Sequence, residues 1–323
     1  MIGPSEKSEG FFYLWSHTNS LIMKYRLFLF LFLFISFNVI GQTPGVDYSW
    51  WNKLHEWKEG SPGWRNWIIM SPGYLGPNAL SVPEVKRGFI NPKTEIEFSA
   101  SSHFLKGDPT QDISGRLFIP FAQGKIAVEM YGVIIEHFAF SEEIRNERFS
   151  RIEDGKGFAV GDFYFSTLIQ LSKDRKFPNT LLRLATKTAS GNQLEGARNT
   201  DSPGYFFDLS FSKELAKTER GMFRPFGLAG FYSWQTNDEL NLQNDAFLYA
   251  IGADFERNTL VFSTSLSGYS GYKNERDKPM QLNFELRKDF LGKAVRIQYV
   301  NGLRDWEYKT IRFSFIWKLK PVV

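Results

Sequence analysis

The chain has 323 residues, of which 42% are hydrophobic, 17% aromatic and 23% charged, a balance that excludes a disordered chain and allows one large domain or two small ones. The net charge of +4 is small and scattered, whereas nucleic-acid binding needs a concentrated basic face, so we expect no nucleic-acid partner. The absence of cysteine excludes disulfides, thiolate metal sites and a lipidated N-terminal cysteine.

The first part of the chain has the pattern of an export signal. Lys24 and Arg26 precede an unbroken apolar run over residues 27–35. Such a run after basic residues is typical of a secretory signal peptide, and it is too short to cross a membrane as a helix. We therefore expect residues 1–22 to be an upstream over-extension of the reading frame and residues 23–41 to be a cleaved signal peptide.

Residues 42–93 are rich in tryptophan and in turns. Trp50, Leu54 and Trp57 stand at helical spacing, which predicts a short amphipathic helix over residues 48–58. The rest of the segment is interrupted by Ser-Pro-Gly and Gly-Pro-Asn turns. We expect an irregular segment that is held by its aromatic side chains.

From residue 94 onward, apolar and polar side chains alternate with a period of two, as in Phe163, Phe165 and Thr167. Period two is typical of β-strands with one apolar and one polar face. The pattern predicts about twelve strands, over residues 94–104, 112–120, 125–137, 158–171, 180–187, 205–212, 223–234, 246–256, 259–269, 280–288, 294–300 and 306–319.

The connections between these strands alternate in length. The long, polar ones are residues 138–157, 188–204, 235–245 and 270–279, and the tight ones are 121–124, 257–258 and 289–292. Outer-membrane barrels have short periplasmic turns and long outer loops, while a soluble β-sandwich needs no such alternation. We therefore predict an all-β fold in which residues 94–323 form a transmembrane, antiparallel, up-and-down β-barrel.

The two faces of the strands predict what surrounds them. Apolar residues such as Phe247, Ile251 and Phe313 would face lipid, and aromatic girdles would lie at strand ends, with Tyr205, Tyr232, Trp234, Tyr299, Trp306, Tyr308 and Trp317 as candidates. The polar face would line a pore through Arg116, Glu129, Asp162, Arg183, Lys187, Asp208, Glu285, Arg287, Arg296 and Arg312. Either these side chains set a field for anionic or polar solutes, or they pair across the lumen and satisfy one another.

The tryptophan-rich segment would then act as a plug. We expect it to pack against the lumen wall and narrow the pore from the periplasmic side through Trp50, Trp51, Trp57, Trp64 and Trp67. The alternative is that these aromatic rings stack on sugars or aromatic solutes.

Catalytic and metal-binding patterns are weak. A lipid-modifying hydrolase would need a histidine base beside a serine, for which Glu136, His137 and a loop serine such as Ser141 or Ser202, or else His103, are the candidates. No nucleophile elbow and no metal-ligand spacing is present. We expect no cofactor, no metal site and no catalytic residue.

The run GDFYFSTLIQL, followed by LLRLATKTASG and then SPGYFFDLSFSKEL, resembles a block in Gram-negative outer-membrane barrels of the phenol-degradation-pathway channel type, over roughly residues 160–215. The stretches SPGYLGPNAL and TDSPGYFFDL are similar to those of a family of uncharacterised outer-membrane barrel proteins. The resemblance implies the location and the fold, and it carries no site residues with it.

These observations predict a narrow channel or binding pore for small polar or aromatic solutes in the outer membrane of a Gram-negative bacterium. Its expected partners are outer-membrane lipid, the barrel-insertion machinery and a small solute. A lipid-modifying hydrolase, or an adhesion or assembly component acting through the outer loops, is the alternative.

Overall fold

The computed structural model describes residues 46–173, 176–218 and 221–320. The expected over-extension and signal peptide lie outside these residues. Two compact units are separated between Trp50 and Trp51, and the barrel belongs to the second unit. Among the described residues, no helix combines the length and apolar character needed to span a membrane.

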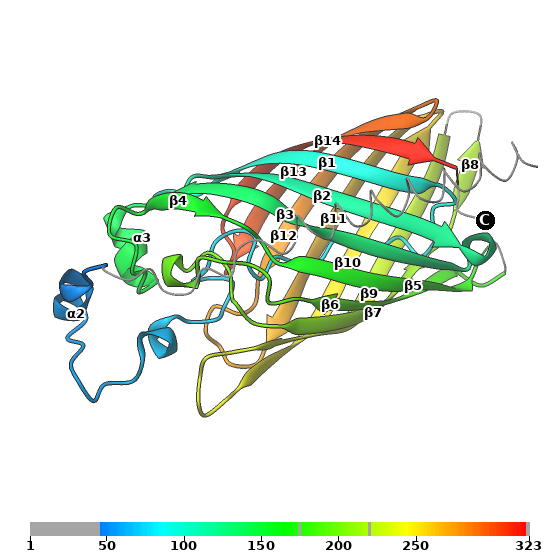
Figure 1. Cartoon of the computed structure of the whole chain (residues 1–323). Coiled ribbons are helices and arrows are strands. Elements are labelled where there is room, and N and C mark those ends of the chain that lie inside the picture. The colour runs from blue at the N-terminus through cyan, green and yellow to red at the C-terminus, as the bar shows by residue number, and fades with distance from the viewer. Residues whose placement is uncertain (1–45, 174–175, 219–220, 321–323) are drawn as a thin grey trace, which may run out of the picture. The chain divides into compact units, whose positions relative to one another are not determined.

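Residues 94–319 form a closed antiparallel β-barrel (Figure 1). Its strands are β1 (Thr94–Phe104), β2 (Thr110–Phe121), β3 (Ile126–Ala139), β5 (Phe163–Ser172), β6 (Asn179–Lys187), β7 (Gly204–Ser212), β9 (Gly221–Gln235), β10 (Gln243–Arg257), β11 (Leu260–Gly271), β12 (Met280–Phe290), β13 (Lys293–Arg304) and β14 (Lys309–Leu319). Pairing of β1 with β14 closes the barrel, from Thr94 opposite Leu319 to Phe104 opposite Lys309. The predicted barrel of about twelve strands is confirmed.

Two short strands lie beside this ring and explain where the predicted boundaries differ. The expected strand over residues 158–171 is interrupted, because β4 (Lys156–Ala159) pairs only with the outer end of β3 and β5 starts at Phe163. At the break, the Gly161 N–H donates to Val133 O at 3.0 Å, and a Cβ on Gly161 would lie 2.7 Å from Val133 Cβ. The connection over 213–220 contains β8 (Ala216–Thr218), which pairs with β9.

The outer surface of the barrel is apolar, as the alternation predicted. Ile251 is 68% exposed, Phe247 58% and Phe313 57%. A continuous exposed apolar surface of this kind is stable in lipid and unfavourable in water. The structure therefore has the outer face of a membrane-spanning barrel.

The two ends of the barrel carry different connections. One end, called here the long-loop end, has residues 140–155 with α3 (Glu142–Glu147), residues 188–203 with η3 (Leu194–Gly196), and residues 236–242 and 272–279. The opposite, short-turn end has η2 (Ala122–Gly124) and the tight turns at 258–259 and 291–292. Strands β1 and β14 respectively begin and end at the short-turn end.

Four of the seven candidate girdle aromatics face the interior instead of lipid. Tyr232, Trp234, Trp306 and Tyr308 are at most 6% exposed. The Trp234 indole donates to Met70 O at 2.9 Å and the Trp306 indole to Pro77 O at 3.0 Å, so their polar atoms are satisfied inside the barrel. Tyr205, Tyr299 and Trp317 do face outward, at 49%, 39% and 45% exposure.

Candidate functional site

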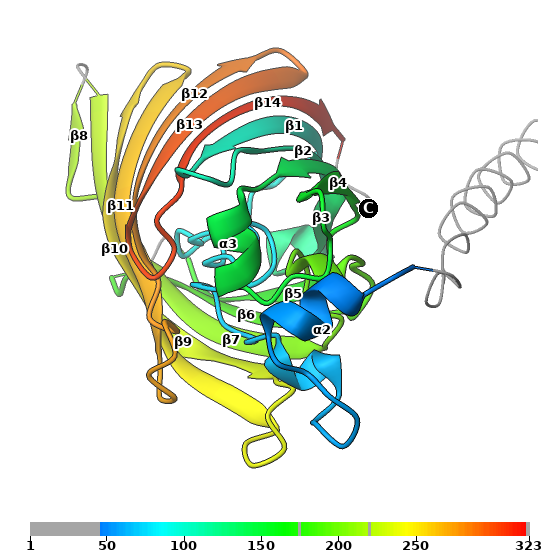
Figure 2. The same ribbon diagram turned by 90° about the vertical axis from the view of Figure 1, so that its left-hand side faces the viewer.

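The interior of the barrel is occupied by residues 68–93, called here the interior segment. It starts among the long loops, where the Gly73 N–H donates to Arg276 O at 3.1 Å, and it leads into β1 at the short-turn end. Figure 2 looks into the barrel from the side of α3, and the cyan chain lies inside the ring of strands. The chain therefore crosses the lumen once before the first barrel strand begins.

The half of the interior segment nearer the long loops is held by apolar packing. Leu75 and Ala79 are fully buried and Leu80 is 1% exposed. They belong to one apolar cluster with the wall residues Tyr164, Phe206, Leu228, Tyr232, Trp234, Leu248 and Tyr269. The Tyr269 hydroxyl also donates to Leu80 O at 2.6 Å. This half of the interior segment therefore packs against the wall as part of an apolar core.

The other half of the interior segment is held by charge. Lys86 Nζ lies 2.8 Å from Glu129 Oε1, and Arg87 lies 2.7 Å from Glu285 Oε1. Glu84 accepts from Arg296 at 2.8 Å. Lys86, Arg116 and Arg296 all lie within 4.0 Å of the Glu84 carboxylate. Its side chain is still 37% exposed to the space inside the barrel.

Gly88 marks the closest approach of the interior segment to the wall. Its φ is +77°, and a Cβ there would lie 2.8 Å from both Asn179 O and Ser212 N. Its N–H donates to Ser210 Oγ and its carbonyl accepts from Gln170 Nε2, at 3.2 and 2.8 Å. Only glycine combines this backbone conformation with the available space.

The ten predicted pore-lining side chains all lie on the inner face, and nine of them form ion pairs. Arg116, Glu129, Glu285, Arg287 and Arg296 join one network. The other pairs are separate: Arg183 lies 2.6 Å from Asp208, and Lys187 lies 2.6 Å from Asp162. Arg312 is the exception, since its guanidinium has no ion pair within 4.0 Å among the described residues and donates instead to Ser101 Oγ at 2.9 Å.

Several members of the charge network were missed by the sequence analysis. Glu95 and Glu97 of β1 are 2% exposed and bind Arg116 at 3.1 and 3.2 Å. Their alternation with Ile96 and Phe98 was a usable signal for the inner face. Glu84, Lys86 and Arg87 carried no such signal, because they lie in an irregular segment. With these five residues included, the six basic and four acidic predicted residues become eight basic and seven acidic.

The tryptophans of residues 51–67 contact the long loops, whereas the sequence predicted a plug that narrows the lumen from the periplasmic side. Helix α2 (Ser49–Leu54) ends earlier than predicted, with Glu56 at φ +54°, and it carries Trp50 and Trp51. The Trp51 indole donates to Phe149 O at 3.0 Å, and Trp64 stacks under the Arg151 guanidinium at 4.9 Å. Trp57 and Trp67 both point their indole N–H at Pro62 O, at 2.9 and 3.4 Å.

Residues 51–67 are therefore attached to the long loops. Arg65 pairs with Asp201 of the β6–β7 loop, and Asn66 donates to Glu239 of the β9–β10 loop at 2.8 Å. The earlier expectation put these residues at the periplasmic end. The physical reason for the difference is that the interior segment crosses the lumen, which places everything just before it at the opposite end from the start of β1.

Because barrels of this kind carry their long loops outside the cell, an epitope inserted after Gly60 should be reached by antibody in intact cells. Gly60 has φ +94° and open space around it, so an insertion is tolerated locally. Matched insertions follow Leu240 in a long loop and Leu291 in a short turn, which are 91% and 98% exposed. Labelling at Gly60 should match that at Leu240; labelling only after permeabilisation, as expected for Leu291, would contradict the arrangement.

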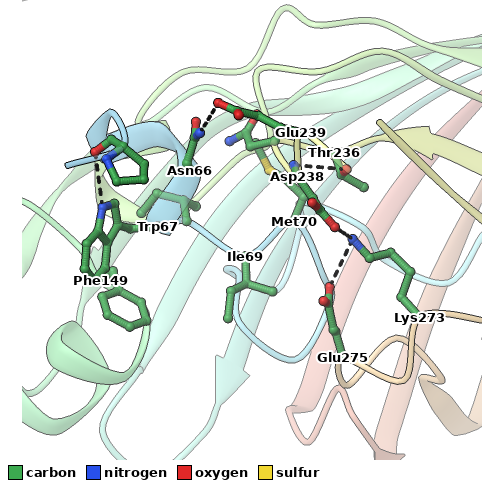
Figure 3. A pocket seen from close by; sticks show the side chains of 13 residues that line it. Asn66, Trp67, Ile69, Met70, Phe149, Thr236, Asp238, Glu239, Lys273 and Glu275 are labelled. Carbon is green, nitrogen blue, oxygen red and sulfur yellow. Dashed lines mark hydrogen bonds and ion pairs between the residues drawn. The ribbon is translucent and has the colours of Figure 1, made fainter. Parts of the chain in front are cut away.

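A pocket of about 470 Å³ opens where residues 62–70 meet the long loops (Figure 3). Trp67 and Phe149, with ring centroids 5.5 Å apart, form an aromatic part of its lining. Lys273 lies 2.6 Å from Asp238 and 3.5 Å from Glu275 on the opposite side. The hydrogen bond from Lys273 lowers the pKa of Asp238 to about 2. Lys273 is thus paired with Asp238 and Glu275, and the third carboxylate of the pocket, Glu239, accepts from Asn66.

A buried polar cluster connects the long loops to the interior segment. It is called here the mouth cluster and consists of Asp108, Thr110, Glu136, Arg148 and Arg198. Arg198 of the β6–β7 loop donates to Asp108 at 2.9 Å, to Glu136 at 2.7 Å and to Thr110 at 2.9 Å. Arg148 adds a contact to Asp108 at 2.6 Å. The Arg198 guanidinium also packs on the backbone at Gly76, where a Cβ would lie 2.7 Å from its Cζ.

The histidine candidates for catalysis are not assembled into the expected triad. Glu136 points inward, where it accepts from Arg198, whereas His137 points outward and contacts Gln111 at 3.2 Å. Neighbouring residues of one strand face opposite sides, so these two cannot cooperate. His103 is buried between Asp112 at 2.6 Å and Thr310 at 2.8 Å, on the inner face and away from lipid.

Space remains on one side of the interior segment. A cavity of about 170 Å³ lies between its residues 77–84 and the polar inner wall of β12–β14, β1–β3 and β5. Its lining includes Tyr131 and Tyr164, stacked at 4.9 Å, together with Arg312, Asn283 and Gln298. The lumen thus has an apolar cluster on one side of the interior segment and a polar cavity on the other.

No protein-family model matches the chain, and no curated protein matches it either. Among solved structures, the chain is similar to the COG4313 outer membrane channel from Pseudomonas putida F1, with a TM-score of 0.50, 11% identity, and coverage of 73% of this chain and 100% of that one. The NanC porin gives a TM-score of 0.47 at 11% identity, with coverage of 69% and 100%. The chain has the fold of outer-membrane β-barrel channels.

Proposed function

We propose that the protein is an outer-membrane channel for small polar or aromatic solutes, whose passage is narrowed by its own interior segment. The apolar outer face and the fold support a position in the outer membrane, reached by export with a cleaved signal peptide. The polar cavity beside residues 77–84 carries the proposal, because it is open space in the lumen next to the interior segment.

The conducting route runs along the polar wall. The interior segment packs against an apolar part of the inner wall, and we place the conducting route on the polar side, along β12–β14 and β1–β3. Because most charged side chains there are already paired, the route selects by size, by hydrogen bonding and by the charge of Arg312, which has no ion pair among the described residues. Aromatic solutes would contact the stacked Tyr131 and Tyr164.

Liposome swelling tests this proposal. Liposomes containing the full-length protein should swell in glycerol and in a pentose, and the swelling rate should fall steeply for a disaccharide and a trisaccharide. Empty liposomes and liposomes with heat-denatured protein give the background. Swelling in glycerol no faster than that background would contradict a channel, and equal rates for all solutes would contradict a narrow one.

A further inference from the structure

The cavity beside the interior segment contains polar groups that the fold leaves without partners. Its volume is about 170 Å³, whereas a cavity of roughly 10–15 Å³ is enough to hold one water molecule. A solute of several heavy atoms therefore fits there. The chemistry of the unpartnered groups indicates which solute this is.

Arg312 supplies a positive charge that is not engaged in an ion pair, since the Asp112 carboxylate interacts with it only from beyond 4.0 Å and is itself bound by His103. The other two arginines of the lining already form ion pairs, since Arg116 and Arg296 each lie within 3.5 Å of at least two carboxylates. Arg312 uses its Nε to donate to Ser101, and among the described residues no carboxylate lies within 4.0 Å of it. Its two terminal nitrogens are free to bind a carboxylate with two parallel hydrogen bonds.

Gln298 supplies a hydrogen-bond acceptor beside that charge. It is 4% exposed, and its Nε2 donates to Glu285 at 3.0 Å, which fixes the orientation of the amide. Its Oε1 is then directed away from Glu285 and has no partner. Asn283 Oδ1, in the same lining, has none either. An acceptor that is buried in this way favours a ligand with a hydroxyl or ammonium donor.

The two groups stand next to each other on the wall. Gln298 of β13 is the direct cross-strand neighbour of Arg312 of β14. Such neighbours have Cβ atoms about 4.5–5.5 Å apart, so one small molecule can reach both. Each of the three acidic members of the lining has a basic partner: Glu84 pairs with Arg296, Glu97 with Arg116 and Asp162 with Lys187.

We propose that this cavity binds a small carboxylate with a neighbouring hydrogen-bond donor, namely a 2-hydroxy acid or an amino acid. The carboxylate pairs with Arg312, and the hydroxyl or ammonium group donates to Gln298. The assignment rests on the proposed channel function and names the solute class of the same route.

Binding to the purified protein in detergent, measured by titration calorimetry, tests the site without any transport. L-Lactate and L-alanine distinguish the two donors, and lactamide, which lacks the charge, should bind at least tenfold more weakly than lactate. Arg312→Gln should weaken lactate binding at least tenfold. Arg304→Gln is the matched control, because Arg304 lies on the same strand as Gln298 with its side chain 57% exposed, and it should leave binding unchanged.

Two further variants show whether a loss of binding comes from the site or from misfolding of the barrel. Arg312→Lys keeps the charge but loses the paired donors, so lactate binding should be intermediate. Gln298→Leu leaves every cation in place and should weaken lactate binding while sparing acetate, which has no donor. Heat-modifiable gel mobility checks that each variant is a folded barrel.

The possible outcomes distinguish failure of the proposed carboxylate site from failure of the proposed channel function. Loss of lactate binding in Arg312→Gln, with a several-fold fall in the anion-to-cation permeability ratio in bilayers, supports both proposals. Lactate binding that is equal in Arg312→Gln, Arg304→Gln and the unmodified protein overturns the solute class even if the protein conducts. Binding that depends on Arg312 in a protein that never conducts keeps the site and overturns the channel.

Discussion

Replacing Arg198 by methionine should destabilise the long-loop end of the barrel by about 3–5 kcal/mol, the usual cost of removing one partner from a buried ion pair. Arg198 is fully buried, and it is the one residue of the mouth cluster that contacts Asp108, Glu136 and Thr110 together. Methionine fills similar space but leaves both carboxylates without this partner. The effect should be local, because the ladder of the barrel strands is untouched.

Hydrogen exchange of the amides in residues 188–203 and 105–109 measures this local stability. Exchange there should accelerate by two or more orders of magnitude in Arg198→Met, whereas amides of the central strands should be unaffected. Arg257→Met, at an exposed arginine of the short-turn end, is the matched control and should change nothing. Unchanged exchange in both variants would mean that the mouth cluster does not hold the loops.

The same cluster should make the long loops sensitive to acid. Burial raises the pKa of Asp108, but Arg198 and Arg148 hold it below its ordinary value of 3.8. A carboxyl with a depressed pKa stabilises the folded state above that ordinary value, and this stabilisation is lost as the pH falls through the lower folded pKa. Loop protection should therefore fall below about pH 4, and much less steeply in Arg198→Met. Parallel acid profiles would contradict this role for Asp108.

The barrel could be predicted from the sequence because its signals are local. Lipid surrounds the outside of every strand, so alternating residues such as Phe247, Tyr249 and Ile251 report the strand and its outer face without knowledge of any neighbour. The alternation of long and short connections depends only on which end of the barrel they join. Both signals can therefore be recognised in a single sequence without an alignment.

The interior could not be predicted in the same way. Lys86 and Glu129 are 43 residues apart in sequence, and Arg87 and Glu285 are 198 apart. Residues 68–93 have no regular period, so their depth in the lumen depends on individual contacts with distant strands. The wrong assignment of Tyr232 and Trp234 to the aromatic girdle has a related cause. Both are separated from the inward-facing Arg224 of β9 by an even number of positions, so they face the interior, but their position near a strand end suggested the lipid interface.

Removal of residues 48–87 should widen the channel and leave the barrel folded. The wall carboxylates that lose a partner in this deletion keep another: Glu129 keeps Arg116 at 3.0 Å, Glu285 keeps Arg296 at 3.4 Å, and Asp254 keeps Arg224 at 2.9 Å. The apolar wall patch formed by Tyr232, Trp234 and Tyr269 becomes exposed to water in the lumen. Heat-modifiable gel mobility should remain, with reduced thermal stability.

The most direct test of the account is the single-channel conductance of this deletion beside that of the full-length protein, in planar bilayers under the same salt. The structure predicts small steps for the full-length protein and steps several-fold larger for the deletion, because the interior segment runs through the lumen and contacts its wall. Equal conductance of the two proteins would contradict the claim that residues 68–93 narrow the route, and silence of both would contradict the channel itself.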